Sequence, residues 1–299
     1  MHSAQQFRML VRDLANGAEG ITQGDDLKVT ALGTPGAAVQ VGDGSGVVRG
    51  KANSFQGSYS ACNIGSATVS IASTGGSPRS DMVVLRILDP QYEGSLDPAT
   101  DQIMFFDVIS NVGSTATVVP GGYTAIPLAR IDIPASTSTI TSGMITDIRQ
   151  CANPRRNRTL WTYSPTAALV EISGSSGTFS YWSNVAGWNI PVPDWATTVK
   201  IVLTICQIRY STADFFGNLS ATFGASLSLQ NTVLDDNNGT GVRRSTVVVA
   251  DTLTIPSAYR GTSQLLRPRA AGGGGNGGHV GMDTGVTLVA DVEFTEAPR

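Results

Sequence analysis

Short runs of alternating apolar and polar residues, separated by glycine-rich turns, are the feature that most restricts how this chain can fold. Such alternation is typical of half-buried strands, and helical spacing of apolar residues is confined to the N-terminus. The 299 residues include 34 glycines, and only 14% of them are charged. These observations predict an all-β fold of two antiparallel domains, sandwich or jelly-roll-like, with one short N-terminal amphipathic helix.

The alternating runs set the expected strands. In the first half they are Leu27–Leu32, Ala38–Val41, Val47–Arg49, Tyr59–Ile64, Ala67–Ala72, Met82–Leu88, Ile103–Ile109, Thr115–Val119 and Ile126–Ile133. In the second half they are Ala168–Ile172, Thr178–Trp182, Thr198–Ile208, Leu219–Leu229, Arg244–Ile255 and Gly285–Phe294. Gly65 with Ser66, and Asn238 with Gly239, have the composition of hairpin turns.

Two of these runs each carry one arginine in an otherwise core-like segment. Arg86 lies within Met82–Leu88, and Arg130 lies within Ile126–Ile133. Apolar residues on both faces of the first run predict a central strand covered on both sides, with the helix a candidate cover for one. Because an unpaired charge inside an apolar strand is costly, we expect both arginines to pair with acids such as Asp81 or Asp132, or with a neighbouring subunit.

The N-terminus predicts the helix. Ser3 and Gln6 stand at capping-box spacing before it, and Gly17 stands where a C-terminal glycine cap belongs. Its apolar residues recur at helical spacing along one stripe and are Phe7, Leu10, Val11 and Leu14. This stripe must be buried somewhere, either on the helix's own domain or on a neighbouring subunit.

A polar, Arg-rich segment divides the chain. Residues 154–158 read PRRNR and suit an exposed linker between a domain of residues 1–153 and a domain of residues 159–299. Arg155, Arg156 and Arg158 are expected to be solvated there, although such a cluster can also bind a phosphate or a partner carboxylate.

All four tryptophans fall in one short stretch of the second domain. With a neighbouring tyrosine, the candidates for ligand contact are Tyr181, Trp182, Trp188 and Trp195. Their rings could stack on sugars, as a carbohydrate-binding receptor module would require. The alternative is that they fill the sandwich core or a subunit interface.

Catalytic and cofactor patterns are weak throughout. The chain has two histidines and three widely separated cysteines, which we expect to be buried free thiols rather than metal ligands. The glycines at 272, 274 and 277 lack the βαβ context of a dinucleotide site, and Asp235–Gly239 lacks the distal glutamate of a calcium loop. The carboxylates Asp283, Asp291 and Glu293 are expected to be solvent-facing rather than a glycosidase pair. We therefore expect no enzymatic activity, no cofactor and no metal.

Charge and hydropathy bear on partners and location. A net charge of −3 gives no electrostatic case for binding nucleic acid, and no apolar run approaches the roughly twenty residues that cross a bilayer. No signal peptide pattern is present at the N-terminus, so synthesis in a cytoplasm is expected.

Several short segments, in order, resemble one family. They are Ser3–Arg8, Asp26–Val29, Gly42–Gly50, Pro78–Val84, Pro127–Ile131 and Ile145–Arg149. Together they span about the first half of the chain. On these segments the chain resembles the minor tail or baseplate proteins of long-tailed bacteriophages that infect actinobacteria.

The resemblance implies a structural virion protein near the distal tail, with a tail-tip docking domain in the first half and a variable second half. It implies a homotrimer, contacts with other tail-tip proteins, a role in host adsorption that could involve a host cell-wall glycan, and no catalytic residues. Candidate interface residues are then the helix stripe and the arginines of the strands and linker: Phe7, Leu10, Leu14, Arg86, Arg130, Arg155, Arg156 and Arg158.

Overall fold

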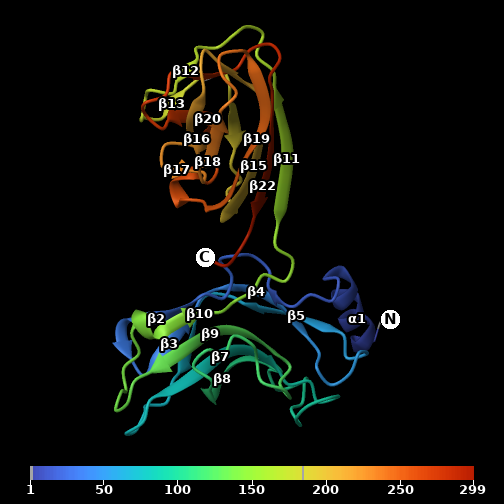
Figure 1. Cartoon of the computed structure of the whole chain (residues 1–299). Coiled ribbons are helices and arrows are strands. Elements are labelled where there is room, and N and C mark those ends of the chain that lie inside the picture. The colour runs from blue at the N-terminus through green and yellow to red at the C-terminus, as the bar shows by residue number, and fades with distance from the viewer. Residues whose placement is uncertain (1–2, 184) are drawn as a thin grey trace. The chain divides into compact units, whose positions relative to one another are not determined.

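The computed structural model describes residues 3–183 and 185–299, and antiparallel strands are their main regular structure (Figure 1). The predicted all-β class with one helix is confirmed. The chain divides into unit 1, Met1–Pro154 with Ala297–Arg299, and unit 2, Arg155–Glu296.

This division differs from the predicted linker at two places. Arg156 and Arg158 lie in strand β11 (Arg156–Tyr163) rather than in an exposed linker, because β11 pairs along its whole length with β22 (Thr287–Thr295). The last three residues belong to unit 1. Arg149 donates to the Arg299 carbonyl at 3.0 Å, and Arg299 forms an ion pair with Asp25 at 2.6 Å.

Unit 1 contains helix α1 (Ala4–Leu14) and three small sheets. Its strands are β1 (Gly20–Ile21), β2 (Val29–Gly36), β3 (Ala38–Val41), β4 (Gly44–Arg49), β5 (Ser58–Asn63), β6 (Ala67–Ser70), β7 (Arg79–Ile87), β8 (Met104–Val112), β9 (Ala125–Ile133) and β10 (Ile145–Asp147). The sheet orders are β1-β4-β5, β2-β3-β6 and β10-β9-β7-β8. Figure 1 shows the two three-stranded sheets over one face of the four-stranded sheet, with the main core of the unit between them.

Strand β7 is central and covered on both faces, as predicted. Val83 and Leu85 point into the main core, whereas Met82 and Val84 point into a second, smaller cluster. This second cluster is covered by Ala116, Val119 and Tyr123 from the loop after β8, and helix α1 contributes no residue to it. The suggestion that the helix covers this face is therefore wrong.

Three further expectations for unit 1 are wrong. Gly65 and Ser66 do not close a hairpin, because β5 pairs with β4 whereas β6 pairs with β3. Thr115–Val119 forms no strand, because Ala116 and Val119 pack on the small cluster and the segment has no ladder partner. Cys62 is exposed, and Cys151 is only partly buried.

Unit 2 is a sandwich of two six-stranded sheets. Its strands are β11 and β22 with β12 (Ile172–Ser173), β13 (Ser180–Tyr181), β14 (Trp188–Pro191), β15 (Thr198–Ser211), β16 (Phe215–Phe223), β17 (Leu227–Ser228), β18 (Thr232–Asp236), β19 (Arg243–Thr254), β20 (Ser263–Gly272) and β21 (His279–Gly281). One sheet has the order β11-β22-β15-β21-β12 with β19 on β15, and the other has the order β13-β20-β16-β17 with β14 on β20 and β18 on β16. Alternate residues of the facing strands β15 and β16 fill the space between the sheets.

Asn238 and Gly239 do not join a hairpin. The loop that contains them leads from β18, which pairs with β16, to β19, which pairs with β15 in the other sheet. Gly239 still has the left-handed φ of +82° that its turn composition predicts.

Strand β20 escapes sequence reasoning although it is central to its sheet. Its interior proline, Pro268, argues against a central strand. Pro268 pairs with Ala221 of β16 on one side. On the other side, β14 pairs with residues 263–266 and β13 with residues 269–270, so that Pro268 falls in the gap between them. A residue without an N–H is tolerated at such a gap.

Candidate functional site: the exposed face of helix α1

The start of α1 forms the predicted capping box. The Gln6 backbone N–H donates to Ser3 Oγ at 3.2 Å, and the Ser3 N–H donates to Gln6 Oε1 at 2.9 Å. These two hydrogen bonds satisfy backbone donors that the first helical turn leaves without intrahelical partners. The local sequence therefore determines where the helix begins.

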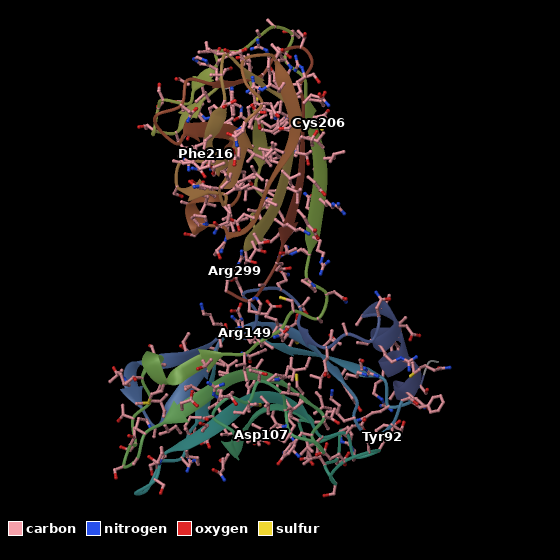
Figure 2. All side chains as sticks on the ribbon, viewed as in Figure 1. Tyr92, Asp107, Arg149, Cys206, Phe216 and Arg299 are labelled. Atoms are coloured by element: carbon pink, nitrogen blue, oxygen red, sulfur yellow. The ribbon has the colours of Figure 1, made fainter. Side chains whose placement is uncertain are left out.

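The side of α1 that faces the unit is built around an arginine. Arg8 is buried, and its guanidinium forms an ion pair with Asp89 at 3.1 Å. It also donates to the Gln56 carbonyl at 3.0 Å and to Gln91 Oε1 at 2.6 Å. Tyr92, labelled in Figure 2, lies in the loop after β7, and its ring centroid is 5.3 Å from the guanidinium carbon.

Tyr59 of β5 completes this network. Its hydroxyl donates to Asp89 at 2.8 Å, and its ring centroid lies 5.7 Å from the guanidinium of Arg8. Burial raises the pKa of Tyr59 well above its ordinary value, so the hydroxyl keeps its proton and remains a donor to the carboxylate. The cation, the carboxylate and the phenol are therefore mutually satisfied in a buried setting.

A glycine allows the helix to approach this closely. Gly57 has a φ of +78°, and a Cβ atom there would lie 2.6 Å from the carbonyl carbon of Arg8. Any other residue would push α1 away from the strand and lengthen the hydrogen bonds of Arg8. Gly57 is therefore a positioning residue for the helix.

The opposite side of α1 is apolar and exposed. Phe7 is 56% exposed, Leu10 is 52% exposed and Leu14 is 74% exposed. Phe55, which is 66% exposed, lies in the neighbouring loop, and Gln5 donates to its carbonyl. A shallow hollow of about 500 Å³ runs along this face and is lined by Gln5, Gln6, Phe7, Met9, Leu10 and Asp13.

Sequence reasoning therefore placed the stripe correctly along one face but left open what buries it. Within the described residues, the unit does not bury it, so the interpretation that the stripe packs on its own domain is wrong. Sequence reasoning missed a second set of residues at helical spacing, which is shifted by one residue from the apolar stripe. Its members are Arg8, Arg12 and Ala15. Asp89 and Tyr59, which are distant in sequence, contact Arg8, and the second set therefore faces the unit.

The strand arginines predicted as interface residues form ion pairs within unit 1. Arg86 pairs with Glu93 and Asp107, each at 2.7 Å, and lies over the ring of Tyr123. Asp107 is labelled in Figure 2. Arg130 pairs with Asp132 at 3.0 Å, as expected. The charges of Arg86 and Arg130 are therefore balanced by acids of the same unit.

The pairing partner expected for Arg86 is corrected, because Asp81 pairs with Arg79 instead. The pKa of Asp132 is lowered, first by its hydrogen bond from Arg130. The acid therefore stays ionised and keeps its arginine in place.

The arginines of the predicted linker also have partners within unit 2. Arg155 pairs with the buried Glu296 at 2.6 Å, and Arg158 pairs with Asp291 at 2.5 Å. Arg156 lies 3.8 Å from Glu293. The hydrogen bond from Arg158 lowers the pKa of Asp291. The contacts of Arg156 and Arg158 are diagonal cross-strand pairs between β11 and β22, which accounts for the acids on β22 as well.

The predicted aromatic platform does not form. Trp182 and Trp188 are 4% and 9% exposed, and their indole N–H groups donate to the carbonyls of Val280 and Thr162, each at 3.3 Å. Trp195 packs against the same core and lies beneath the guanidinium of Arg155 at 5.3 Å. The large apolar rings are buried because that removes the most surface from water. Tyr181 alone of the four is exposed, at 36%.

The described residues contain neither a cluster that could hold a metal ion nor a helix that could span a membrane. Among residues 3–183 and 185–299, no group of three or more His, Cys, Asp or Glu side chains could hold a metal ion. Asp236, from the segment that resembles half a calcium loop, forms an ion pair with Arg243. Over the same residues, no helix has the length and apolar character that crossing a bilayer requires.

Comparisons with known proteins provide no argument about function. The sequence matches no protein-family model and no curated protein. Among solved structures, the infectious bursal disease virus VP2 subviral particle matches with 13% identity and a TM-score of 0.26, over 94% of this chain and 79% of that chain. The T13 viral particle of the same virus matches with 14% identity and a TM-score of 0.24, over 94% and 76%.

A protein of another kind also matches. Wild-type BuGH86 in complex with neoagarooctaose has 13% identity and a TM-score of 0.21, over 86% of this chain and 32% of that chain. TM-scores this low do not indicate a shared fold. None of the three structures therefore carries an argument about function.

Proposed function

We propose that the protein is a structural component of a phage virion, a minor tail protein that docks at the distal tail through unit 1. Unit 2 is then the variable part, available for host adsorption or for contacts with other tail proteins. In this proposal the protein acts as a homo-oligomer, expected to be a trimer, and binds other tail-tip proteins. No catalytic role is assigned to it.

The observation that carries the proposal is the exposed apolar face of α1. Because Arg8 and its partners hold the helix, the leucines on the other side contribute little to folding. Clustered exposed apolar residues of this kind mark interaction sites on proteins. The segments that resemble tail proteins support the same unit, since Ser3–Arg8 begins α1 and Pro78–Val84 and Pro127–Ile131 lie at or in the central strands β7 and β9.

The energetics require an interface larger than the helix face. Full burial of a large apolar side chain contributes about 1.5–3 kcal/mol, and these side chains are already partly covered. Association costs about 4–15 kcal/mol of lost translational and rotational freedom. The helix face is therefore expected to be the apolar centre of a wider contact that includes Phe55 and the rim of polar residues around it.

The test measures the mass of the full chain by light scattering between about 1 and 50 µM, a range that brackets micromolar dissociation constants. We expect an oligomer that Leu10→Asp combined with Leu14→Asp shifts to monomer. Ile64→Asp is the matched control, since Ile64 is 94% exposed in the same unit and away from α1. A wild-type monomer that also fails to bind purified tail components would overturn the proposal.

The absence of a catalytic role has its own test. The purified chain is incubated with host cell-wall polysaccharide, and reducing ends are measured over time. We expect no release above buffer. A release that disappears in Asp291→Asn or Glu293→Gln would contradict the proposal and assign an active site to β22.

A further inference from the structure

The outer face of β20 presents two arginines in a setting unlike that of the other strand arginines. Along β20, Leu266, Pro268 and Ala270 point into the sandwich. The alternating Arg267 and Arg269 therefore lie on the opposite face, two residues apart and on the same side of the sheet.

The residues directly across from these arginines are neutral. Arg269 is paired with Tyr181 of β13 on one side and with Ser220 of β16 on the other, and Arg267 is paired with Thr222. Elsewhere in unit 2, Arg158, Arg209 and Arg244 each form an ion pair with an acid. Arg269 differs from these three arginines, because its described side-chain contacts are with a ring and a hydroxyl.

For Arg269, an aromatic ring and a hydroxyl take the place of an acid. The guanidinium carbon of Arg267 lies 3.6 Å from the centroid of the Tyr181 ring, and that of Arg269 lies 4.4 Å from the centroid of Phe179. Arg269 also donates to Ser228 Oγ at 3.1 Å. Its Nε is buried and has no hydrogen-bond partner among the described residues.

These contacts fix the arginines without neutralising Arg269. Stacking on a ring orients the planar guanidinium fork, which matches a carboxylate or a phosphate with two parallel hydrogen bonds. Ser228 adds a hydroxyl at the edge of the same face.

We propose that this face, comprising Phe179, Tyr181, Ser228, Arg267 and Arg269, binds the carboxylate or phosphate group of an acidic saccharide. Arg269 receives the oxyanion, and the exposed Tyr181 and the exposed hydroxyl of Ser228 contact the sugar. An exposed aromatic side chain beside a hydroxyl suits a hydroxylated ligand. A nucleic acid is a poor fit, because its binding rests on neutralising many phosphates and this face offers two cations.

The inference goes beyond the docking role of unit 1 and does not depend on it. The proposed face belongs entirely to unit 2. Oligomer formation and ligand binding are measured separately, so failure of one leaves the other standing.

The test is a calorimetric titration of the full chain at low ionic strength with four probes. They are an oligogalacturonate, an oligosaccharide that carries phosphate groups, an uncharged oligosaccharide of matched length and inorganic phosphate. We expect an acidic polymer to bind, the uncharged oligosaccharide not to bind, and Arg269→Gln to weaken binding at least about tenfold, the loss that one charge-assisted hydrogen bond represents. Arg269→Lys is expected to recover part of this loss, since it keeps the charge without the fork.

Arg49→Gln is the matched control, because Arg49 is exposed in unit 1 and the substitution changes the net charge equally. An unchanged tryptophan emission spectrum verifies that unit 2 is folded in each variant. Comparison of the two acidic polymers identifies which oxyanion is recognised. Equal losses in Arg49→Gln and Arg269→Gln, or equal binding of the uncharged oligosaccharide, would overturn the site.

Two further outcomes also decide against the proposal. If inorganic phosphate bound as tightly as both polymers, and Tyr181→Ala did not change the affinity for the polymers, the face would be a simple anion site and would not recognise a saccharide. Failure of every anionic probe to bind at millimolar concentration would remove the site altogether.

Discussion

Helix α1 in unit 1 and strand β20 in unit 2 orient their arginines and leucines in opposite directions. In α1 the arginine points inward and the leucines point outward, whereas in β20 a leucine points inward and the arginines point outward. Arg8 contacts a carboxylate and two tyrosines, and Arg269 contacts the ring of Phe179 and the hydroxyl of Ser228. The position of a charged residue therefore follows from the partners that the rest of the fold places opposite it, not from its hydropathy.

The difference also separates the two surfaces by the partner each one suits. An outward apolar stripe gains free energy when another apolar surface covers it, independent of charge. An outward guanidinium gains from an oxyanion, and this gain depends on ionic strength.

Arg8→Ala removes the inward side of α1. The Asp89 carboxylate then stays buried without its cation, and breaking such a pair costs about 3–5 kcal/mol of unfolding free energy. All four tryptophans lie in unit 2, so tryptophan fluorescence is expected to be unchanged. Hydrogen exchange is expected to accelerate in α1 and β5.

Arg12→Ala supplies the control for this prediction. Arg12 pairs with Asp13, which is 64% exposed, and removal of such a surface pair costs less than about 1 kcal/mol. If both variants lost the same stability, the buried network of Arg8 would not be what holds the helix.

Salt is expected to act on one surface and not on the other. Raising sodium chloride from about 50 to 500 mM shortens the screening length and should weaken oxyanion binding at Arg269 several-fold. The oligomer expected from the apolar face of α1 should persist or tighten under the same change. Calorimetry and light scattering in the two buffers provide the measurement, and an equal response of both would remove the distinction.

The tyrosines beside the two arginines are expected to titrate in opposite directions. A hydrogen bond from Thr222 and the charges of Arg269 and Arg267 lower the pKa of Tyr181, whereas burial raises the pKa of Tyr59. Ultraviolet absorbance of Tyr181→Phe and Tyr59→Phe against the wild type assigns the two steps. Removal of Arg269 should raise the pKa of Tyr181 toward the ordinary value of about 10.

The sign of the effect on stability follows from these directions. Above about pH 10 the unfolded chain loses the Tyr59 proton while the folded chain keeps it, so the folded state binds more protons. The contribution of Tyr59 is therefore complete below that pH and is lost as the pH rises toward its folded pKa. Alkaline unfolding of unit 1 that is unaffected by Tyr59→Phe would contradict this account.

Local patterns predicted the fold class and several elements. Ala38–Val41 is a strand with its predicted bounds, and the capping box of Ser3 and Gln6 forms as expected. Each depends on residues within a few positions of one another, which is the range over which propensity and capping act.

Pairing between distant residues was not predictable in the same way. Strands β5 and β6 are neighbours in the chain yet belong to different sheets, and β20 was missed because only the arrangement of β13 and β14 makes room for Pro268. For the candidate sites, the stripe of α1 was visible in the sequence, but the arginines of β20 were not singled out. Their significance depends on which residues lie across the strand.

By itself, the sequence determined an all-β chain with one capped helix and two unlike halves, because alternation, turn residues and caps are local. Only the tertiary structure decided that Arg8 rather than Leu10 faces the interior, that the tryptophans are core residues and that Arg269 has no acid beside it. The reason is electrostatic and steric, since the free energy of a charge or a large ring depends on partners brought within a few ångströms by the fold.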